Sequence, residues 1–185
     1  AAVSALSEKK IKLNCKVCQL VKLFKNGQPF KMSKRAGDFI SAQDLLSEVD
    51  KDPIRFMMLN RSNDVELDFD FDKVKEKTKD NPVFYVQYAY ARINSLLRTL
   101  NTSFVEKIEF NEIDFALNEM EEKIIRKVFE WPKIIESASR KFDLHKIPFY
   151  LYELSTLFHA YWSKGNEDKK YKFIENEKIK RKEIL

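Results

Sequence analysis

The sequence predicts a mainly α-helical protein in which a helical bundle follows a short β-hairpin. Three glycines and five prolines are few for 185 residues, so little interrupts the formation of long helices. Apolar side chains recur at steps of three and four over much of the chain, as they do in amphipathic helices. A single Asn-Gly pair, Asn26-Gly27, follows a run of β-forming residues and is typical of a hairpin turn.

Composition limits the class of protein further. The chain has 44% hydrophobic and 13% aromatic residues and a net charge of +5. These values indicate a folded core with a moderate preference for polyanionic partners such as nucleic acid. No stretch approaches the roughly eighteen consecutive apolar residues of a membrane span. The N-terminal stretch AAVSALSEKK places its charges after its apolar residues, which is the reverse of a signal peptide.

Two cysteines, Cys15 and Cys18, have C-x-x-C spacing. A zinc finger would need two further ligands at short spacing, whereas the only histidines, His145 and His159, are fourteen positions apart. We therefore expect no structural metal and interpret the two cysteines as reduced thiols.

The N-terminal region is expected to form a β-hairpin followed by a basic loop. Residues 15–24 are rich in β-forming side chains, and residues 28–31 are placed to return antiparallel after the turn. The loop FKMSKRAGDF (30–39) comes next. Its two lysines, three positions apart, could both direct ammonium groups at a triphosphate, and Gly37 gives the loop conformational freedom. The alternative is an ordinary basic turn on the surface.

Two short helices and an extended segment are expected next. Ser41, followed three residues later by Asp44, is a candidate N-cap with a variant of the capping box. Asp52 is a candidate N-cap for a second helix, with Pro53 at its first position. The acidic, alternating stretch SNDVELDFDFD (62–72) predicts an extended connection to the helical region.

The helix expected over 82–100 has two contrasting sides. A core-facing stripe at helical spacing consists of Val83, Val86, Tyr90, Ile93, Leu97 and Leu100. The opposite side carries a column of Tyr85, Tyr88, Arg92 and Ser95. Tyrosine rings and a guanidinium in one column can stack on unpaired bases and pair with phosphate, as in the recognition of single-stranded RNA. The alternative is a second packing side against a neighbouring helix.

Two further helices are expected in the middle of the bundle. Asn111 is a candidate N-cap for the first of them. Its core side repeats at helical spacing through Ile113, Leu117, Met120, Ile124 and Val128. The pair Trp131-Pro132 interrupts this run, and a further helix is expected to continue to about Phe142.

The last helix is expected to begin at Pro148 and to end at Gly165 as its C′ residue. It is apolar nearly all round, so it should lie centrally in the bundle. The lysine-rich tail after Gly165 is expected to form a final, incomplete helix. Its lysines could follow a phosphate backbone, but the interleaved acidic residues favour a solvated charged surface.

Several stretches resemble one enzyme family. KMSKR (31–35) resembles the second signature of class I aminoacyl-tRNA synthetases. RFMMLNRSNDVELDFD (55–70), DNPVFYVQYAYARI (80–93) and YLYELSTLFHAYW (150–162) are similar, in the same order, to segments of arginyl-tRNA synthetase. The likeness extends from about Val17 to Asn166.

The resemblance implies a ligase that condenses arginine with ATP, with magnesium, and transfers the arginine to tRNA-Arg. Lys31 and Lys34 match the signature lysines and are the implied catalytic residues, because their charges can stabilise the negative charge that develops on the phosphates. Together with Met32 and Ser33 they are also the implied ATP contacts. Gly37 would let the loop close over the nucleotide.

The resemblance also implies that the helical region is an anticodon-binding domain. On this basis Tyr85, Tyr88 and Arg92 become candidates for contact with tRNA. Asn81 and Gln87 match the same motif, and we expect structural roles for them in capping and bracing the helix.

Two aromatic positions of the last helix, His159 and Tyr161, also match the family, and we expect both to pack in the core. Tyr90 stands where the family usually has histidine. Because Tyr90 falls on the predicted apolar stripe, no function is assigned to it.

The resemblance divides the chain into two parts. Residues 1–50 are interpreted as the C-terminal remnant of a catalytic nucleotide-binding domain, and residues 51–185 as an α-helical anticodon-binding domain that is truncated at its C-terminus. The first class I signature and an arginine pocket are not found, so we expect the chain alone to be inactive. The intact enzyme is expected to be cytoplasmic and monomeric. The alternatives are a free-standing RNA-binding module and a fragment of the related cysteinyl enzyme.

Overall fold

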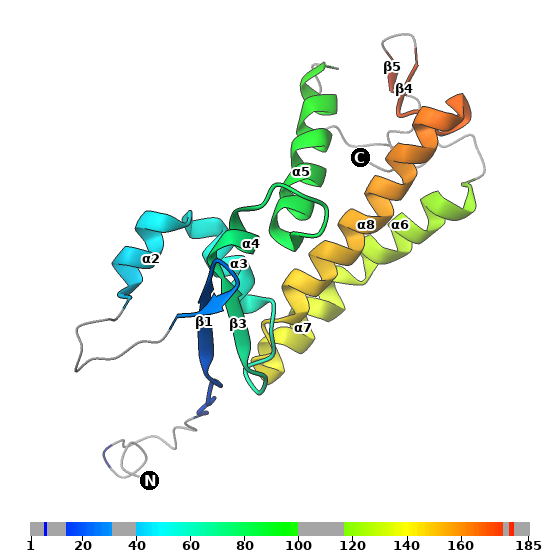
Figure 1. Ribbon diagram of the computed structural model, residues 1–185. Helices are drawn as coiled ribbons and strands as arrows, with labels where there is room; N and C mark the ends of the chain where they lie inside the picture. Colours follow the sequence, from blue (N-terminus) through cyan, green and yellow to red (C-terminus); the bar gives the residue numbers. More distant parts are fainter. Residues whose placement is uncertain (1–5, 7–13, 31–39, 100–116, 176–177, 180–185) are drawn as a thin grey trace.

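Figure 1 shows the computed structural model, which describes residues 6, 14–30, 40–99, 117–175 and 178–179 of the chain. A three-stranded sheet with short helices forms one packing unit, and a group of longer helices forms the other. The predicted fold class is confirmed, because the protein is mainly helical and this sheet precedes the helical bundle. No helix among the described residues is long and apolar enough to cross a lipid bilayer.

A small mixed sheet forms the first unit. Strands β1 (Val21–Lys25) and β2 (Gln28–Pro29) make an antiparallel hairpin, and β1 also pairs in parallel with β3 (Leu67–Asp70), in the order β2-β1-β3. Asn26 and Gly27 have positive φ angles of 52° and 69°, as a type I′ turn requires. The predicted hairpin is therefore confirmed, but its first strand is shorter than expected, because residues 15–20 lie outside β1. The parallel partner lies in the stretch that the sequence predicted only as an extended connection.

Helix α2 (Ala42–Glu48) begins with the predicted capping box. The Ser41 hydroxyl accepts a hydrogen bond from the Asp44 backbone N–H, and the Asp44 carboxylate accepts one from the Ser41 backbone N–H. These two bonds satisfy backbone donors that the first helical turn would otherwise leave free.

Helix α3 (Lys51–Leu59) starts earlier than the sequence indicated. The predicted N-cap, Asp52, is wrong: Asp50 holds that position and Asp52 lies inside the first turn. The predicted N-cap was therefore two residues too late in the chain. Asp52 still interacts favourably with the helix dipole from its place in the first turn. Helix α4 (Phe71–Lys75) follows β3 directly, and Asp70 caps its N-terminus.

The core of the sheet unit combines strand and helix side chains. It is formed by Leu23, Val49, Phe69, Phe71 and Val74. Ile54, Met57 and Met58 of α3 pack against this cluster. Helix α3 therefore packs with the sheet, although it follows the predicted domain boundary at residue 50, and that boundary stays a prediction.

Helix α5 (Pro82–Thr99) starts at a strongly fixed point. The buried Asn81 side chain donates to the carbonyl oxygens of Val74 (2.9 Å) and Glu76 (2.7 Å) and accepts from the Val83 backbone N–H (3.1 Å). Asn81 thus ties the end of α4 to the first turn of α5, as its expected capping and bracing role requires.

The core side of α5 differs in part from the predicted stripe. Val83 and Leu97 are buried and Ile93 packs against the bundle core, but Tyr90 is 67% exposed. Tyr90 was therefore wrongly placed in the core. The buried side of α5 instead includes Ala89 and Leu96. The small Ala89 side chain permits close approach of α8, which packs against α5. Leu100 lies outside the described residues.

Helices α6 (Glu119–Phe129) and α7 (Trp131–Lys141) follow. The N-cap of α6 is Asn118, which forms a capping box with Glu121, whereas the predicted cap Asn111 lies outside the described residues. Ile124 is buried as predicted, but Val128 is 50% exposed, so the predicted core side fails at its last position.

Helix α7 has the predicted extent and ends at a residue in the left-handed region. Phe142 is its C-cap, with φ 56° and ψ 34°. This conformation lets the backbone N–H groups after the helix satisfy its last carbonyls. The turn through Phe142 leads directly into the last long helix.

Helix α8 (Lys146–Glu167) lies centrally, as predicted, and packs against α5, α6 and α7. Figure 1 shows α5 on one side of α8 and the α6–α7 pair along the other. The core between them is formed by Ala89, Leu96, Ile124, Phe158, Tyr161 and Phe173. Within it the Tyr161 hydroxyl donates to the Glu121 carboxylate at 2.7 Å, which confirms the packing role expected for Tyr161.

Gly165 does not end α8, which corrects the sequence prediction. It lies within the helix, where an added Cβ would stand 2.9 Å from the Tyr171 carbonyl oxygen. The glycine is needed for this close approach of the chain. After α8 come a 3-10 turn, η2 (Lys169–Tyr171), and a short hairpin of β4 (Ile174–Glu175) and β5 (Lys178–Ile179). A final helix was expected there.

Candidate nucleic-acid interface

The predicted column of Tyr85, Tyr88 and Arg92 lies where α5 meets α8. Tyr85 and Arg92 are half-buried, whereas Tyr88 is 42% exposed. The Tyr85 ring packs against Tyr152 and His159 of α8, with ring centroids 5.4 Å and 4.4 Å apart. The column therefore serves partly as a packing side, while Tyr88 presents an aromatic ring to solvent. Contact with RNA stays a prediction for all three residues.

Arg92 is the centre of this cluster. Its guanidinium carbon lies 4.1 Å from the centroid of the Tyr88 ring and 4.9 Å from that of Trp162 on α8. One terminal nitrogen donates to the Tyr88 hydroxyl at 2.7 Å, and the other lies 3.3 Å from Nδ1 of His159. A guanidinium has five N–H donors, so the hydrogen bonds within the described part of the chain leave three of them for a ligand.

His159 of α8 contacts the Arg92 guanidinium, and the two contacts of its ring nitrogens define its tautomer. Its Nε2 atom lies 3.1 Å from the Tyr85 carbonyl oxygen, which can only accept, so Nε2 carries the proton. Nδ1 is then the acceptor for Arg92. Burial, reinforced by the positive charge of Arg92, lowers the pKa of His159 below its usual value of 6.5. The ring is therefore neutral at pH 7, as this hydrogen-bond arrangement requires.

The aromatic surface continues toward the start of α5. Phe84 stacks on Tyr88 with ring centroids 5.7 Å apart and an interplanar angle of 10°. The rings of Tyr88 and Trp162 thus flank the Arg92 cation, and Phe84 extends the aromatic surface beyond Tyr88. No carboxylate is paired with Arg92 among the described residues. We name Phe84, Tyr88, Arg92 and Trp162, with Tyr85 and His159, the aromatic–arginine cluster. Chemically it can offer ring surfaces to unpaired bases and a charge-assisted donor to phosphate.

Comparison with known proteins identifies the family. A family model described as the DALR anticodon binding domain matches residues 86–184, which includes Tyr88, Arg92 and His159. The chain belongs to the DALR anticodon-binding domain family. The match begins within α5 and extends through α8. It includes four of the six cluster residues, while Phe84 and Tyr85 lie just before it.

Longer relatives of this DALR chain are arginine–tRNA ligases. The arginine–tRNA ligase of Pelagibacter ubique is 57% identical over 178 residues, which cover 96% of this chain and 31% of the relative. That of Ruegeria pomeroyi is 49% identical, over 95% of this chain and 31% of the relative. The chain therefore spans about a third of the length of these relatives.

A solved structure supports the same relationship. A Campylobacter jejuni protein described as an arginyl-tRNA synthetase is similar in fold, with a TM-score of 0.69 and 28% identity. The similarity covers 80% of this chain and 32% of the other. At 80% of the chain, the similarity extends beyond the residues 86–184 that the DALR family model matches.

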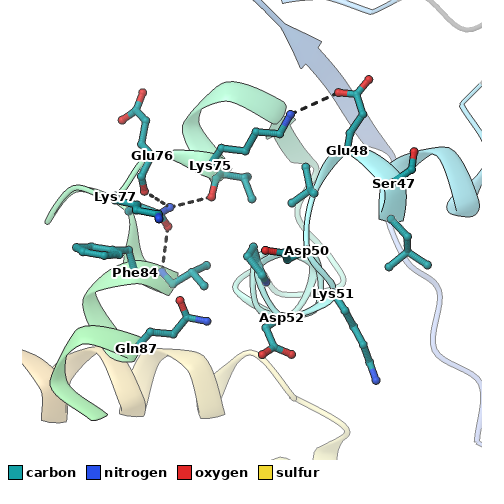
Figure 2. Close-up of a pocket in the computed structure, with 16 residues that line it drawn as sticks. Ser47, Glu48, Asp50, Lys51, Asp52, Lys75, Glu76, Lys77, Phe84 and Gln87 are labelled. Atoms are coloured by element: carbon teal, nitrogen blue, oxygen red, sulfur yellow. Dashed lines mark hydrogen bonds and ion pairs between the residues drawn. The ribbon is translucent and has the colours of Figure 1, made fainter. Parts of the chain in front are cut away.

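A cavity of about 560 Å³ lies at the junction of α2, α3, α4 and α5. Figure 2 shows Asp50, Asp52 and Gln87 around this cavity, with the Phe84 ring directed away from the two aspartates. Glu48 and Glu76 add two more carboxylates, and Glu48 is paired with Lys75. Lys51, Lys75 and Lys77 also line the cavity, so its four carboxylates are nearly balanced and it has no excess positive charge to attract phosphate. The cavity is therefore a weaker candidate for RNA contact than the cluster around Arg92.

The predicted nucleotide-side residues Lys31, Met32, Ser33 and Lys34 lie outside the described residues, as does Gly37. The residues that flank this loop, Phe30 and Ile40, both pack against the core of the sheet unit. Their packing fixes where the loop leaves and rejoins the fold.

The cysteines Cys15 and Cys18 are exposed and unbridged. Across the parts of the chain that the structure describes, no three His, Cys, Asp or Glu side chains are grouped so that they could hold a metal ion.

Sequence reasoning missed the part that α8 plays in the cluster. His159 was expected to pack in the core, and it is only 6% exposed, but its hydrogen bond to Arg92 was not foreseen. Trp162 was not singled out. Its spacing of three from His159 on an aromatic-rich helix is the signal that could have placed both side chains on the α5-facing side.

Proposed function

We propose that this chain is part of an arginine–tRNA ligase that activates arginine with ATP and magnesium and transfers it to tRNA-Arg. Identity of 57% over nearly the whole chain to such a ligase carries the proposal. The relatives are about three times longer, so most of the machinery for the reaction lies in regions that this chain does not match. In the cell the intact enzyme acts as a cytoplasmic monomer.

The contribution of this chain is to bind tRNA through its DALR domain. The aromatic–arginine cluster supports this role, because Arg92 retains free donors beside rings on which bases can stack. We propose that Tyr88 and Arg92 contact unpaired nucleotides of the tRNA directly. Tyr85 fixes the cluster by packing from α5 against Tyr152 and His159 of α8, and it contacts RNA at the margin of the cluster.

The loop at residues 31–35 contributes to the chemical step in the intact enzyme. Lys34, with Lys31, stabilises the negative charge that develops on the ATP phosphates, and Met32 and Ser33 contact the nucleotide. Replacing Lys34 with alanine in the full-length ligase should slow arginyl-adenylate formation by about 100-fold or more. The chain alone should form no arginyl-tRNA, which an aminoacylation assay with tRNA-Arg measures directly.

The experiment that tests tRNA binding compares tRNA-Arg with a variant whose anticodon is exchanged, across a series of salt concentrations. Anticodon-dependent affinity that persists as salt rises supports the proposal. If both RNAs bind weakly and lose affinity equally with salt, only general phosphate attraction remains. That result would mean that specificity resides in the intact enzyme, and it would remove the support for Tyr85, Tyr88 and Arg92 as tRNA contacts.

A further inference from the structure

Arg92 and His159 are joined by a hydrogen bond across the α5–α8 interface. Arg92 projects from α5, and three α8 residues, Tyr152, His159 and Trp162, pack around the tyrosines and guanidinium of this column. Among these α8 side chains only His159 hydrogen-bonds the Arg92 guanidinium in the described structure, at 3.3 Å. The ring is itself fixed from a second direction by its 3.1 Å bond to the Tyr85 carbonyl oxygen.

We propose that His159 is a positioning residue for RNA recognition: its unprotonated Nδ1 atom orients the Arg92 guanidinium so that the remaining donors face the RNA. This inference rests on the proposed tRNA-binding function. It assigns no direct RNA contact to His159, which is almost fully buried. A flexible arginine loses much side-chain entropy on binding, and a pre-oriented one loses less.

The hydrogen bond from Arg92 to His159 requires the neutral form of the His159 ring. The titratable groups that contact the ring are Tyr85, Tyr88 and Arg92 of α5, and Phe158 packs on it from α8. Arg92 is the only charged group among these described contacts. A proton on Nδ1 would remove the acceptor and place a second positive charge beside the guanidinium. Arg92 would then lose its fixed orientation.

Two conservative variants separate the two hydrogen bonds of the ring. In His159→Asn the side-chain oxygen can occupy the place of Nδ1 and accept from Arg92, while the bond to Tyr85 is lost. In His159→Gln the amide nitrogen can occupy the place of Nε2 and donate to Tyr85, while the acceptor for Arg92 is lost. A purely structural role of the ring predicts that both variants lose affinity in proportion to their loss of stability.

The experiment measures affinity for tRNA-Arg between pH 5.5 and 8 for the full chain and both variants. We expect His159→Gln to bind about tenfold more weakly at pH 7.5 and His159→Asn to bind within about threefold of the original chain. The original chain should lose affinity below pH 6.5 relative to His159→Asn. In an Arg92→Ala background, His159→Gln should have no further effect. Equal losses in the two variants, or a loss that persists without Arg92, would overturn the proposal.

A measurement without RNA distinguishes failure of this inference from failure of the proposed function. In ¹⁵N spectra of the free chain at pH 7.5, His159 should show a protonated Nε2 and an unprotonated Nδ1. The Arg92 guanidinium nitrogens should give resolved signals that broaden in His159→Gln but persist in His159→Asn. The opposite tautomer, or unresolved Arg92 signals in the original chain, would refute positioning by His159 even if tRNA binds.

Discussion

Among the hydrogen-bonded polar pairs that join α8 to its neighbours, two differ in how far solvent reaches them. Tyr161 and Glu121 link α8 to α6, and both side chains are 0% exposed. His159 and Arg92 link α8 to α5 at the edge of the bundle, where Arg92 is only half-buried. The Tyr161–Glu121 pair is fully buried in the core, whereas the His159–Arg92 pair is partly exposed at the surface.

The difference teaches how one helix can serve stability and recognition at once. A sealed carboxylate has its interactions inside the protein, so its removal is costly to the fold. The Glu121 carboxylate also accepts from the Asn118 backbone N–H at 2.8 Å and so completes the cap of α6. The Arg92 guanidinium retains contact with solvent, so its charge remains available for a ligand. Burial, more than residue type, separates the two roles.

Replacing Glu121 with alanine should produce the largest effect on stability. The substitution breaks the capping box and removes the acceptor of Tyr161 in the core, and we expect a loss of about 3 kcal/mol in the free energy of unfolding. Urea denaturation measures it. The matched control is Glu119→Ala, an exposed change in the same helical turn, which removes an ion pair with Lys123 and should lower the unfolding midpoint much less than Glu121→Ala does. Similar midpoints for the two variants would contradict the comparison.

Replacing Arg92 with alanine should affect recognition much more than folding. We expect affinity for tRNA-Arg to fall by about ten- to a hundredfold, because a charge-assisted contact is lost, with a loss of about 1 kcal/mol or less in stability. Filter binding at fixed salt measures the affinity. The control is Arg98→Ala on the same helix, which removes an equal charge outside the cluster. If Arg98→Ala lowers the affinity for tRNA-Arg as much as Arg92→Ala does, the loss in both variants reflects only the reduced net charge of the chain.

Acidification should weaken the hydrogen bond between His159 and Arg92 and lower the stability of the folded chain. The pKa of His159 is lowered in the folded chain, so the unfolded chain binds the proton more readily. The stabilising contribution of the neutral ring is therefore complete above about pH 6.5 and is lost as pH falls through the folded-state value. Thermal unfolding from pH 8 to 5.5 should show this loss in the original chain. The loss should be smaller in His159→Gln, and an equal pH dependence would exclude His159 as its source.

A third pair extends the comparison to partly exposed surface side chains and should have the smallest effect. Lys16 donates to Asp143 at 3.1 Å and to Asn63 at 3.2 Å, and so connects the start of the sheet unit to the turn before α8. Exposed ion pairs add little to stability. We expect Lys16→Ala to leave the thermal midpoint within experimental error. A clear decrease would show that this contact couples the two packing units more strongly than its exposure indicates.

Local signals in the sequence predicted most of the fold. The Asn26-Gly27 turn and the Ser41 capping box depend on neighbouring residues only, and both are present. The predicted core position of Tyr90 failed because an apolar repeat identifies a helix side but does not fix which neighbour covers it. Gly165 was misassigned for a similar reason: a glycine near a helix end predicts a cap, whereas here it accommodates the Tyr171 carbonyl.

The candidate site was predictable only on the α5 side. Tyr85, Tyr88 and Arg92 share one column because helical spacing places them there. The partners His159 and Trp162 come from α8, far away in the chain, and no local pattern pairs two such helices. The hydrogen bond that orients Arg92 depends on that pairing. It became visible only with the structure.

The parallel pairing of β1 with β3 has a consequence for the order of folding. Val21 pairs with Leu67, so the sheet cannot close until the chain containing α2 and α3 has formed its crossover. The hairpin of β1 and β2 is local and can form within microseconds, but the third strand must wait for a long loop to close, at an entropic cost. During synthesis β1 therefore leaves the ribosome well before its parallel partner. The edge of β1 that pairs with β3 stays unpaired for that interval, and we expect its closure to be slower than formation of the hairpin.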